Sequence, residues 1–474
     1  MVFSSPTFLF AFLPISLAIY FLSGRTAFKN ISLLLLSLIF YAWGEPWFVL
    51  VMLGLTALNY FAAIAIDDAK GRLRPGLFVT ALSVNLGILG AFKYAAFAVT
   101  SLNAVAGLTL QVPEVELPLG ISFFTFHCMS YLIDIYRGQF SANRKFSEMA
   151  LYIALFPQLI AGPIVRYKTI ARQLSKRRHT IGRASIGMRI FIIGLAQKIL
   201  IADEVARIAD AVFNANGAQS LADSWLGTLA YTLQIYFDFA GYSNMAIGLG
   251  FIFGFALPRN FNLPYTSRSI TEFWRRWHMS LSAWFRDYLY IPLGGNRLGP
   301  LKTYRNLLIV FLLCGLWHGA SWAFVVWGLY HGFFLVLERI GLGRLLKAVP
   351  LVLSWAWTLL VVMVGWVFFR ADTLSDAMLM LQSMFGMRGE VALSEPLRAM
   401  IAPLQMLVLG AGIALAMIPR RKWRLVRTDA RGAAPAIWRG ASSLAQATGA
   451  TLLLVLALLS ISGGTYSPFL YFRF

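Results

Sequence analysis

Residues 31–58 read ISLLLLSLIFYAWGEPWFVLVMLGLTAL, and they decide the fold class because they hold a single charged residue, Glu45. A helix needs ~20 mostly apolar residues to cross the ~30 Å hydrocarbon core of a bilayer. This stretch is long enough, and Gly44-Glu45-Pro46 divides it in two because proline cannot continue a helix. The backbone must satisfy its own hydrogen bonds in hydrocarbon, so such runs are helical. The sequence lacks the short alternating segments typical of β-barrel spans.

The rest of the chain has the same character. Of its 474 residues 59% are hydrophobic and 13% charged, against roughly a quarter charged in globular chains. We therefore predict an all-α, polytopic integral membrane protein with one membrane domain over residues 1–474. The expected spans are 7–23, 30–43, 47–66, 77–100, 118–136, 148–165, 185–202, 225–256, 304–337, 352–369, 400–418 and 445–462. Prolines and a glycine interrupt span 148–165, which favours a re-entrant segment there.

The net charge of +21 would suggest nucleic acid in a soluble protein. Here the basic residues lie in loops and at helix ends, which favours contact with anionic lipid headgroups and no nucleic-acid partner. Three basic stretches, Arg166 to Arg189, Arg259 to Arg305 and Arg420 to Arg439, are expected on the cytoplasmic side. The N-terminus has no charged region or cleavage site of a signal peptide, so the first span is expected to remain.

Residues 257–290 read LPRNFNLPYTSRSITEFWRRWHMSLSAWFRDYLY, which is too charged for a span and too aromatic for a solvated loop. An amphipathic element at the membrane interface would hold both kinds of residue. Ser269 or Thr271 can cap a helix that begins near Glu272. On one unbroken helix the following residues would share a face: Trp274, His278, Leu281 and Phe285. A lone histidine on such a face is more often a packing residue than a catalyst.

A second histidine, His318, makes a catalytic role easier to support than a packing role. Residues 311–331 read FLLCGLWHGASWAFVVWGLYH and place His318 inside a strongly apolar run, between Gly315 and Gly319. An ionisable group at membrane depth is costly, and its default interpretation is functional. The glycines remove side-chain bulk where something must approach closely. His318 is therefore the leading candidate for a catalytic residue, with His278 second.

The other histidines have plainer interpretations. His331 lies 13 residues after His318, about 220° around an unbroken helix, so we expect it to face away, as a structural residue or one near the membrane interface. His179 lies in a basic loop and is expected to be solvated. His127 shares a helical face with Asp134, which predicts a packing pair.

The two cysteines lie in apolar runs and predict neither a disulfide nor a metal site. Cys314 lies one turn before His318, where a thiol could accept an acyl group, although a small packed residue is the preferred interpretation. Cys128 lies beside His127.

A buried neutral imidazole suits proton abstraction from a hydroxyl that attacks an activated acyl group. A basic and aromatic rim on the cytoplasmic side suits the phosphates and adenine of an acyl coenzyme A. The candidate contacts for that cofactor are Trp274, Arg275, Arg276, Trp277 and Arg286. These residues alone do not separate an acyltransferase from a channel with a histidine gate.

The sequence resembles the membrane-bound O-acyltransferases, in the bacterial branch of alginate O-acetyltransferases and teichoic-acid D-alanylation proteins. The motifs that carry the resemblance are MVFSSPTFLFAFLP (Met1–Pro14), FFTFHCMSYLIDIYRG (Phe123–Gly138), FPQLIAGPIVRY (Phe156–Tyr167), FWRRWHMSLSAWFRDYLYIPLGG (Phe273–Gly295), GLWHGASWAFVVWGLYHG (Gly315–Gly332) and the closing YSPFLYFRF. The two histidine motifs are long and specific, and the likeness covers the whole chain.

The resemblance implies that His318 is the family's near-invariant histidine and that His278 is its second polar residue. It implies a ring of tilted helices around a funnel and tunnel, in the bacterial inner membrane. Acetyl would arrive as cytoplasmic acetyl-CoA, not tightly bound, and leave on the other face with an esterase-like partner of a polysaccharide synthesis machinery. Alginate is the first choice of polymer, and cellulose and peptidoglycan are alternatives. A non-catalytic acetyl conduit or scaffold is the other function class.

Overall fold

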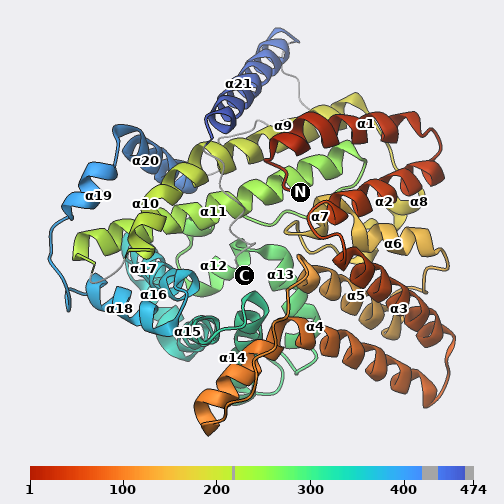
Figure 1. Cartoon of the computed structure of the whole chain (residues 1–474), viewed down its shortest axis with the longest axis horizontal. Helices are drawn as coiled ribbons and strands as arrows, with labels where there is room; N and C mark the ends of the chain where they lie inside the picture. Colours follow the sequence, from red (N-terminus) through yellow and green to blue (C-terminus); the bar gives the residue numbers. More distant parts are fainter. Residues whose placement is uncertain (216–218, 419–435, 465–474) are drawn as a thin grey trace.

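The computed structural model describes residues 1–215, 219–418 and 436–464, and within these ranges the chain is helical without a single strand. Figure 1 shows helices arranged around a centre occupied by α12 and α13. The first elements are η1 (Phe8–Phe12), α1 (Leu13–Leu22), α2 (Thr26–Ala42), α3 (Phe48–Asp68), α4 (Leu73–Ala106), α5 (Ile121–Tyr136), α6 (Phe146–Ala154), α7 (Phe156–Leu159), α8 (Tyr167–Ser175), α9 (Ile181–Ala196), η2 (Gln197–Ala202) and α10 (Asp203–Phe213).

The second half continues in the same way. Its elements are α11 (Leu221–Ile252), η3 (Pro264–Thr266), α12 (Ile270–Arg276), α13 (Met279–Phe285), η4 (Arg286–Tyr290), α14 (Pro300–His318), α15 (Trp322–Leu337), η5 (Glu338–Leu342), α16 (Gly343–Ala348), α17 (Leu351–Arg370), α18 (Leu374–Met384), α19 (Glu395–Met400), α20 (Pro403–Met417) and α21 (Ala436–Ser462). The segments η1, η2, η4 and η5 are π-helical turns and η3 is a 3₁₀ turn.

The all-α, multi-pass prediction is confirmed. Six helical segments of the described ranges are long and apolar enough to cross a membrane: Phe48–Asp68, Leu73–Ala106, Ile181–Phe213, Trp322–Ala348, Leu351–Arg370 and Leu444–Ser462. Three shorter apolar helices, Phe8–Leu22, Thr26–Ala42 and Pro403–Met417, match further predicted spans. The third basic stretch and the closing motif fall outside the residues whose side chains are described.

Two predicted spans are broken. Residues 148–165 divide at Leu155 into α6 and α7, followed by an irregular stretch that is buried in protein. The Tyr152 hydroxyl donates to the Val165 carbonyl at 2.9 Å and ties the irregular stretch back onto α6. Residues 304–337 are not one helix, because α14 ends at His318 and α15 begins at Trp322.

Glycines allow the long helices to pack with their backbones in contact. A side chain on Gly194 would place its Cβ 2.5 Å from the Gly241 carbonyl oxygen, and one on Gly315 would place it 2.2 Å from the Phe324 carbonyl oxygen. Small residues at helix crossings are the usual means of close packing in membranes. The first contact joins α9 to α11, which lie side by side in Figure 1, and the second joins α14 to α15. Together they fix the two walls between which the central helices lie.

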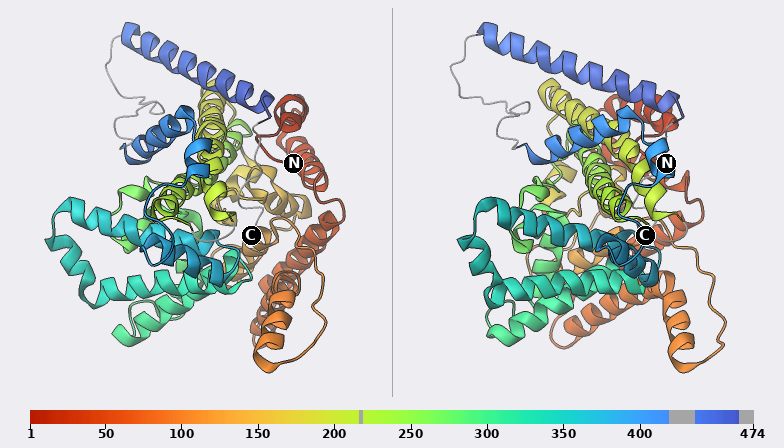
Figure 2. Two further views of the ribbon diagram at one scale, coloured as in Figure 1. Left: turned by 60° about the vertical axis from the view of Figure 1, so that its left-hand side comes forward. Right: turned by 90° about the vertical axis from the view of Figure 1, so that its left-hand side faces the viewer.

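Helix α21 is the exception to this close packing. It lies along one edge of the molecule in both views of Figure 2. Its contacts are with α9 and η2, and only 11% of its most apolar window is buried. Most of this helix therefore faces away from the protein.

Candidate active site

His318 is the last residue of α14 and is 4% exposed. The helix stops there because Gly319 has an extended backbone, with φ −160° and ψ 151°. Any side chain at this glycine would place its Cβ 2.1 Å from the Phe324 ring. The sequence Gly315 to Gly319 thus lets α15 approach closely and leaves the imidazole at a helix end inside the protein.

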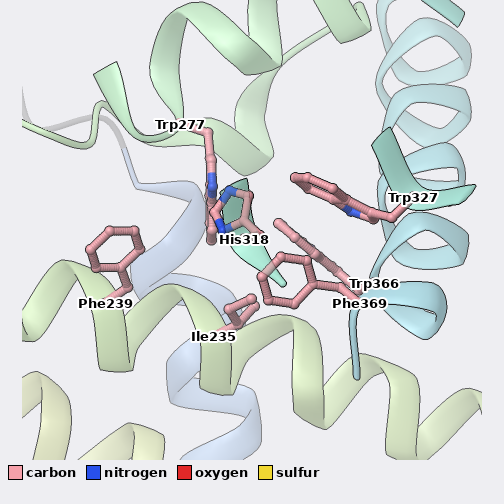
Figure 3. Close-up of a pocket in the computed structure, with 7 residues that line it drawn as sticks. All are labelled: Ile235, Phe239, Trp277, His318, Trp327, Trp366 and Phe369. Atoms are coloured by element: carbon pink, nitrogen blue, oxygen red, sulfur yellow. The ribbon is translucent and has the colours of Figure 1, made fainter. Parts of the chain in front are cut away.

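An aromatic pocket surrounds the imidazole, and Figure 3 shows its walls. Helix α11 forms one side, Trp277 lies beside the ring, and side chains from α15 and α17 close the other side. The residues of the aromatic pocket are Ile235, Phe239, Trp277, His318, Trp327, Trp366 and Phe369. Its cavity volume of about 10 Å³ is roughly the room that one water molecule needs and far below the ~300–1,000 Å³ of ordinary small-molecule sites. An acyl group could lie beside the His318 ring only after the aromatic side chains move apart.

His278 occupies a break between α12 and α13, so the predicted unbroken helix through Trp274 and Phe285 is wrong. Its backbone is left-handed, with φ 42° and ψ 54°, a conformation that costs a non-glycine residue ~1–3 kcal/mol. The predicted cap at Ser269 is confirmed, since its hydroxyl accepts the Glu272 amide at 3.0 Å. The helix that it caps ends after Arg276, and the break turns the His278 ring toward the centre of the protein.

Asn260 holds this break in place. Its backbone carbonyl accepts the Met279 amide at 2.9 Å, and its side-chain oxygen accepts the amide and hydroxyl of Ser280 at 3.2 and 3.0 Å. The same oxygen lies 3.1 Å from His278 Nδ1. Because an amide N–H already donates to it, this atom must be the acceptor, and Nδ1 carries the proton. Nε2 is then the unprotonated nitrogen, and it has no hydrogen-bond partner among the described residues.

The structure brings the two candidate histidines together. Their ring centroids are 6.5 Å apart, and Trp317 lies against both, at 6.2 Å from His278 and 4.9 Å from His318. Phe239, on the pocket wall, meets the His278 ring edge-on at 4.7 Å. The two imidazoles are thus separate but belong to one aromatic cluster.

The predicted cofactor contacts do not form one surface. Trp274 and Trp277 are buried, Trp274 against Phe311 and Trp327, and Trp277 in the aromatic pocket. Arg276 is paired with Glu272 at 2.6 Å. Arg275 and Arg286 are exposed and remain accessible from outside the protein. The tryptophans belong to the core because the break at His278 turns them inward, which helical periodicity did not predict.

An ion-pair network lies next to Arg286. Burial acts to raise the pKa of Asp287, but hydrogen bonds from Arg286 and Arg166 outweigh it and hold the pKa below its usual value. Both arginines lie 2.6 Å from the carboxylate. Arg166 also lies 5.1 Å over the Tyr288 ring. This network joins the first two basic stretches.

The remaining histidines have different environments from those predicted. His127 accepts the Val165 amide at 3.2 Å, while Asp134 accepts the Tyr288 hydroxyl at 2.8 Å, so each bonds elsewhere. His179 is half-buried and bonds to the Tyr20 hydroxyl at 2.9 Å, and burial, Lys29 and Arg177 lower its pKa. His331 is buried rather than at an interface, 5.2 Å from the Trp327 ring.

Two residues near His318 were missed by the sequence analysis. Lys93 and Tyr94, on α4, donate hydrogen bonds to the last carbonyls of α14. A lysine in the middle of an apolar run was the available signal, because such a residue is rarely placed there without a partner. Cys314 is buried and free, as is Cys128.

A multi-pass helical protein with two buried histidines in one aromatic cluster is consistent with a membrane acyltransferase. Residues 124–371 match the membrane-bound O-acyltransferase family. The chain is 45% identical to a probable alginate O-acetylase AlgI of Pseudomonas putida, over all of both chains. It is 47% identical to the Pseudomonas aeruginosa protein of that name, over 85% of this chain and 78% of the relative. A peptidoglycan O-acetyltransferase of Helicobacter pylori is 38% identical, over 82% and 80%.

The chain therefore belongs to the membrane-bound O-acyltransferase family and is an O-acyltransferase.

Proposed function

We propose that this protein takes acetyl groups from cytoplasmic acetyl-CoA and passes them across the bacterial inner membrane for O-acetylation of an exopolysaccharide. Alginate is the first candidate for that polymer. The observation that carries the proposal is His318, a buried base at a helix end that aromatic side chains enclose. The similarity to the alginate O-acetylases over the full chain supports the choice of polymer.

In this mechanism His318 is the general base. Its imidazole takes the proton of the acceptor hydroxyl, and the oxygen attacks the thioester carbonyl of the donor. The carbon–sulfur bond then breaks, the acetyl ester forms, and the thiolate of coenzyme A leaves and takes up a proton. Removal of the hydroxyl proton by a positioned base contributes ~10²–10⁴-fold to such rates.

His278 would help to position the hydroxyl-bearing acceptor beside His318. Its unprotonated Nε2 faces no protein partner among the described residues and can accept a hydrogen bond from a hydroxyl. Asn260 fixes the tautomer that makes this possible. The ring centroids are 6.5 Å apart, so one acceptor molecule could reach both imidazoles.

The donor would bind on the cytoplasmic side, near the second basic stretch. Arg275 and Arg286 are exposed there and suit the phosphates of coenzyme A, since guanidinium groups bind phosphate through paired hydrogen bonds. The other three predicted contacts would not touch the donor at the rim. Trp274 and Trp277 are buried and would support the site by packing, and Arg276 is paired with Glu272.

The final acetylation would need a partner. The aromatic pocket is far too small for a polysaccharide strand, and the polymer is modified outside the inner membrane. A serine nucleophile on an esterase-like protein at the outer face would receive the acetyl group and pass it to the polymer. The relative that acts on peptidoglycan favours peptidoglycan as the second candidate polymer, and cellulose remains an alternative.

The test is turnover of acetyl-CoA by the purified chain supplied with a small alcohol as hydroxyl acceptor, with the His318→Ala variant as control. Release of coenzyme A by the wild type alone supports catalysis on this chain. If both proteins are equally inactive while a polymer-acetylating partner still binds, the chain is a conduit or scaffold. Liposomes with acetyl-CoA inside and polymer outside test the relay: efficient polymer acetylation without a second protein would contradict it.

A further inference from the structure

We infer that Lys93 is a positioning residue that holds the end of helix α14, and with it His318, in place. The inference rests on the proposed function only in that His318 is taken as the reacting base. Lys93 lies on α4, in the apolar run around residues 88–98, and its ammonium group reaches the last turn of α14. Tyr94, the next residue, reaches the same turn.

A helix that ends inside the protein leaves its last four carbonyls without helical partners. At the end of α14 all four are accounted for. The Gly315 carbonyl accepts the Gly319 amide at 3.2 Å, and the Leu316 carbonyl accepts the Tyr94 hydroxyl at 2.8 Å. The carbonyls of Trp317 and His318 both accept from Lys93 Nζ, at 2.5 and 3.2 Å. Three of the four bonds depend on two adjacent residues of α4.

The hydrogen-bond donors of the Lys93 side chain are also all satisfied. An ammonium group has three N–H donors and no acceptor. Two of its hydrogens go to α14, and the Ser122 hydroxyl at the start of α5 lies 3.4 Å away as the third acceptor. A cation near the C-terminus of a helix also interacts favourably with the helix dipole. Lysine thus satisfies two carbonyls at once, which no neutral side chain of this length does.

The consequence for His318 is geometric. Its Cα belongs to the turn that Lys93 and Tyr94 hold, and the break at Gly319 follows directly, so the helical backbone does not continue beyond the residue. Without these donors the free carbonyls lie buried in apolar surroundings, which favours unwinding of the turn. A shift of ~1 Å in a catalytic group can cost ~10²-fold in rate.

The experiment compares four variants of the full chain in detergent or liposomes. Lys93→Met removes all the donors at similar volume, Lys93→Arg keeps the charge and the donors, and Tyr94→Phe removes one hydrogen bond. Asn85→Leu is the matched control, because Asn85 is a buried polar residue of α4 that bonds to Asn59 and not to α14. The measurements are kcat and KM for acetyl-CoA, and amide hydrogen exchange of the peptide that covers residues 314–322.

We expect Lys93→Met to lower kcat by roughly 10–100-fold with KM little changed, and Tyr94→Phe by about fivefold. Both should raise exchange at 314–322, Lys93→Arg should restore most of the rate, and Asn85→Leu should change neither quantity. The inference is overturned if Lys93→Met matches the wild type in exchange or kcat, or if Asn85→Leu reproduces its effects. If Lys93→Met does not fold, Tyr94→Phe alone decides by the same criteria. If the wild type does not turn over acetyl-CoA, the proposed function is refuted, the kcat criterion does not apply, and hydrogen exchange alone decides this inference.

Discussion

The side-chain oxygen of Asn260 lies 3.1 Å from Nδ1 of His278, across a break between two short helices. That oxygen also accepts two hydrogen bonds from Ser280, so a single amide fixes the backbone turn, the ring orientation and the tautomer. A residue outside the two histidine motifs therefore prepares the second histidine for its role.

Replacing Asn260 with alanine should lower kcat by roughly 10–100-fold, by analogy with the loss seen when the hydrogen-bond partners of metal-binding histidines are removed. The physical reason is that His278 loses its fixed tautomer and the turn loses its anchor. Asn262→Ala is the control, since Asn262 contributes backbone groups to the same loop. Equal rates for both variants in acetyl-CoA turnover would refute this role. His278→Ala should be severe, and His278→Asn should retain part of the rate.

His318→Ala should abolish acetylation, with a loss of about 10²–10⁴-fold, while the protein still folds in membranes. The cause is removal of the base that takes the hydroxyl proton. Polymer acetylation at matched expression is the measurement, and His179→Gln on the basic loop is the control. Near-normal acetylation by the alanine variant would show that the base lies elsewhere.

Cys314→Ala should remain active. The thiol is buried one turn before His318, and we interpret it as a small packed residue rather than an acyl carrier. Cys128→Ala is the matched control for loss of a buried thiol. Complete loss of acetyl-CoA turnover in the first variant, together with a thioester trapped on Cys314 of the wild type, would reverse the interpretation.

The loop that begins at Arg166 should face the cytoplasm because it is basic. A cysteine introduced at Ser175, which is exposed at the end of α8, should resist an impermeant thiol reagent in intact cells. It should react after permeabilisation. The two native cysteines are buried, so they add little background. Ready labelling of intact cells would invert the topology.

The sequence predicted the helical class and most spans because apolar length alone determines them. It singled out His318 because ionisable groups at membrane depth are rare, and the family resemblance added His278; the structure places the two rings 6.5 Å apart. It could not predict the break at His278, since the left-handed turn depends on Asn260, a residue 18 positions earlier. For the same reason it placed Trp274 and Trp277 on the rim, whereas contacts with distant helices bury them.

The aromatic pocket also has a consequence for fidelity. Thioesters are lost to water when a reactive site is wet, and a closed apolar site prevents this side reaction. Its walls are hydrocarbon and aromatic rings, with Phe369 5.2 Å from the His318 ring. The residues that enclose the His318 ring therefore also protect a thioester there from hydrolysis. A polar substitution such as Phe369→Ser should admit water and divert part of the acetyl transfer to hydrolysis. Coenzyme A would then be released faster than ester is formed.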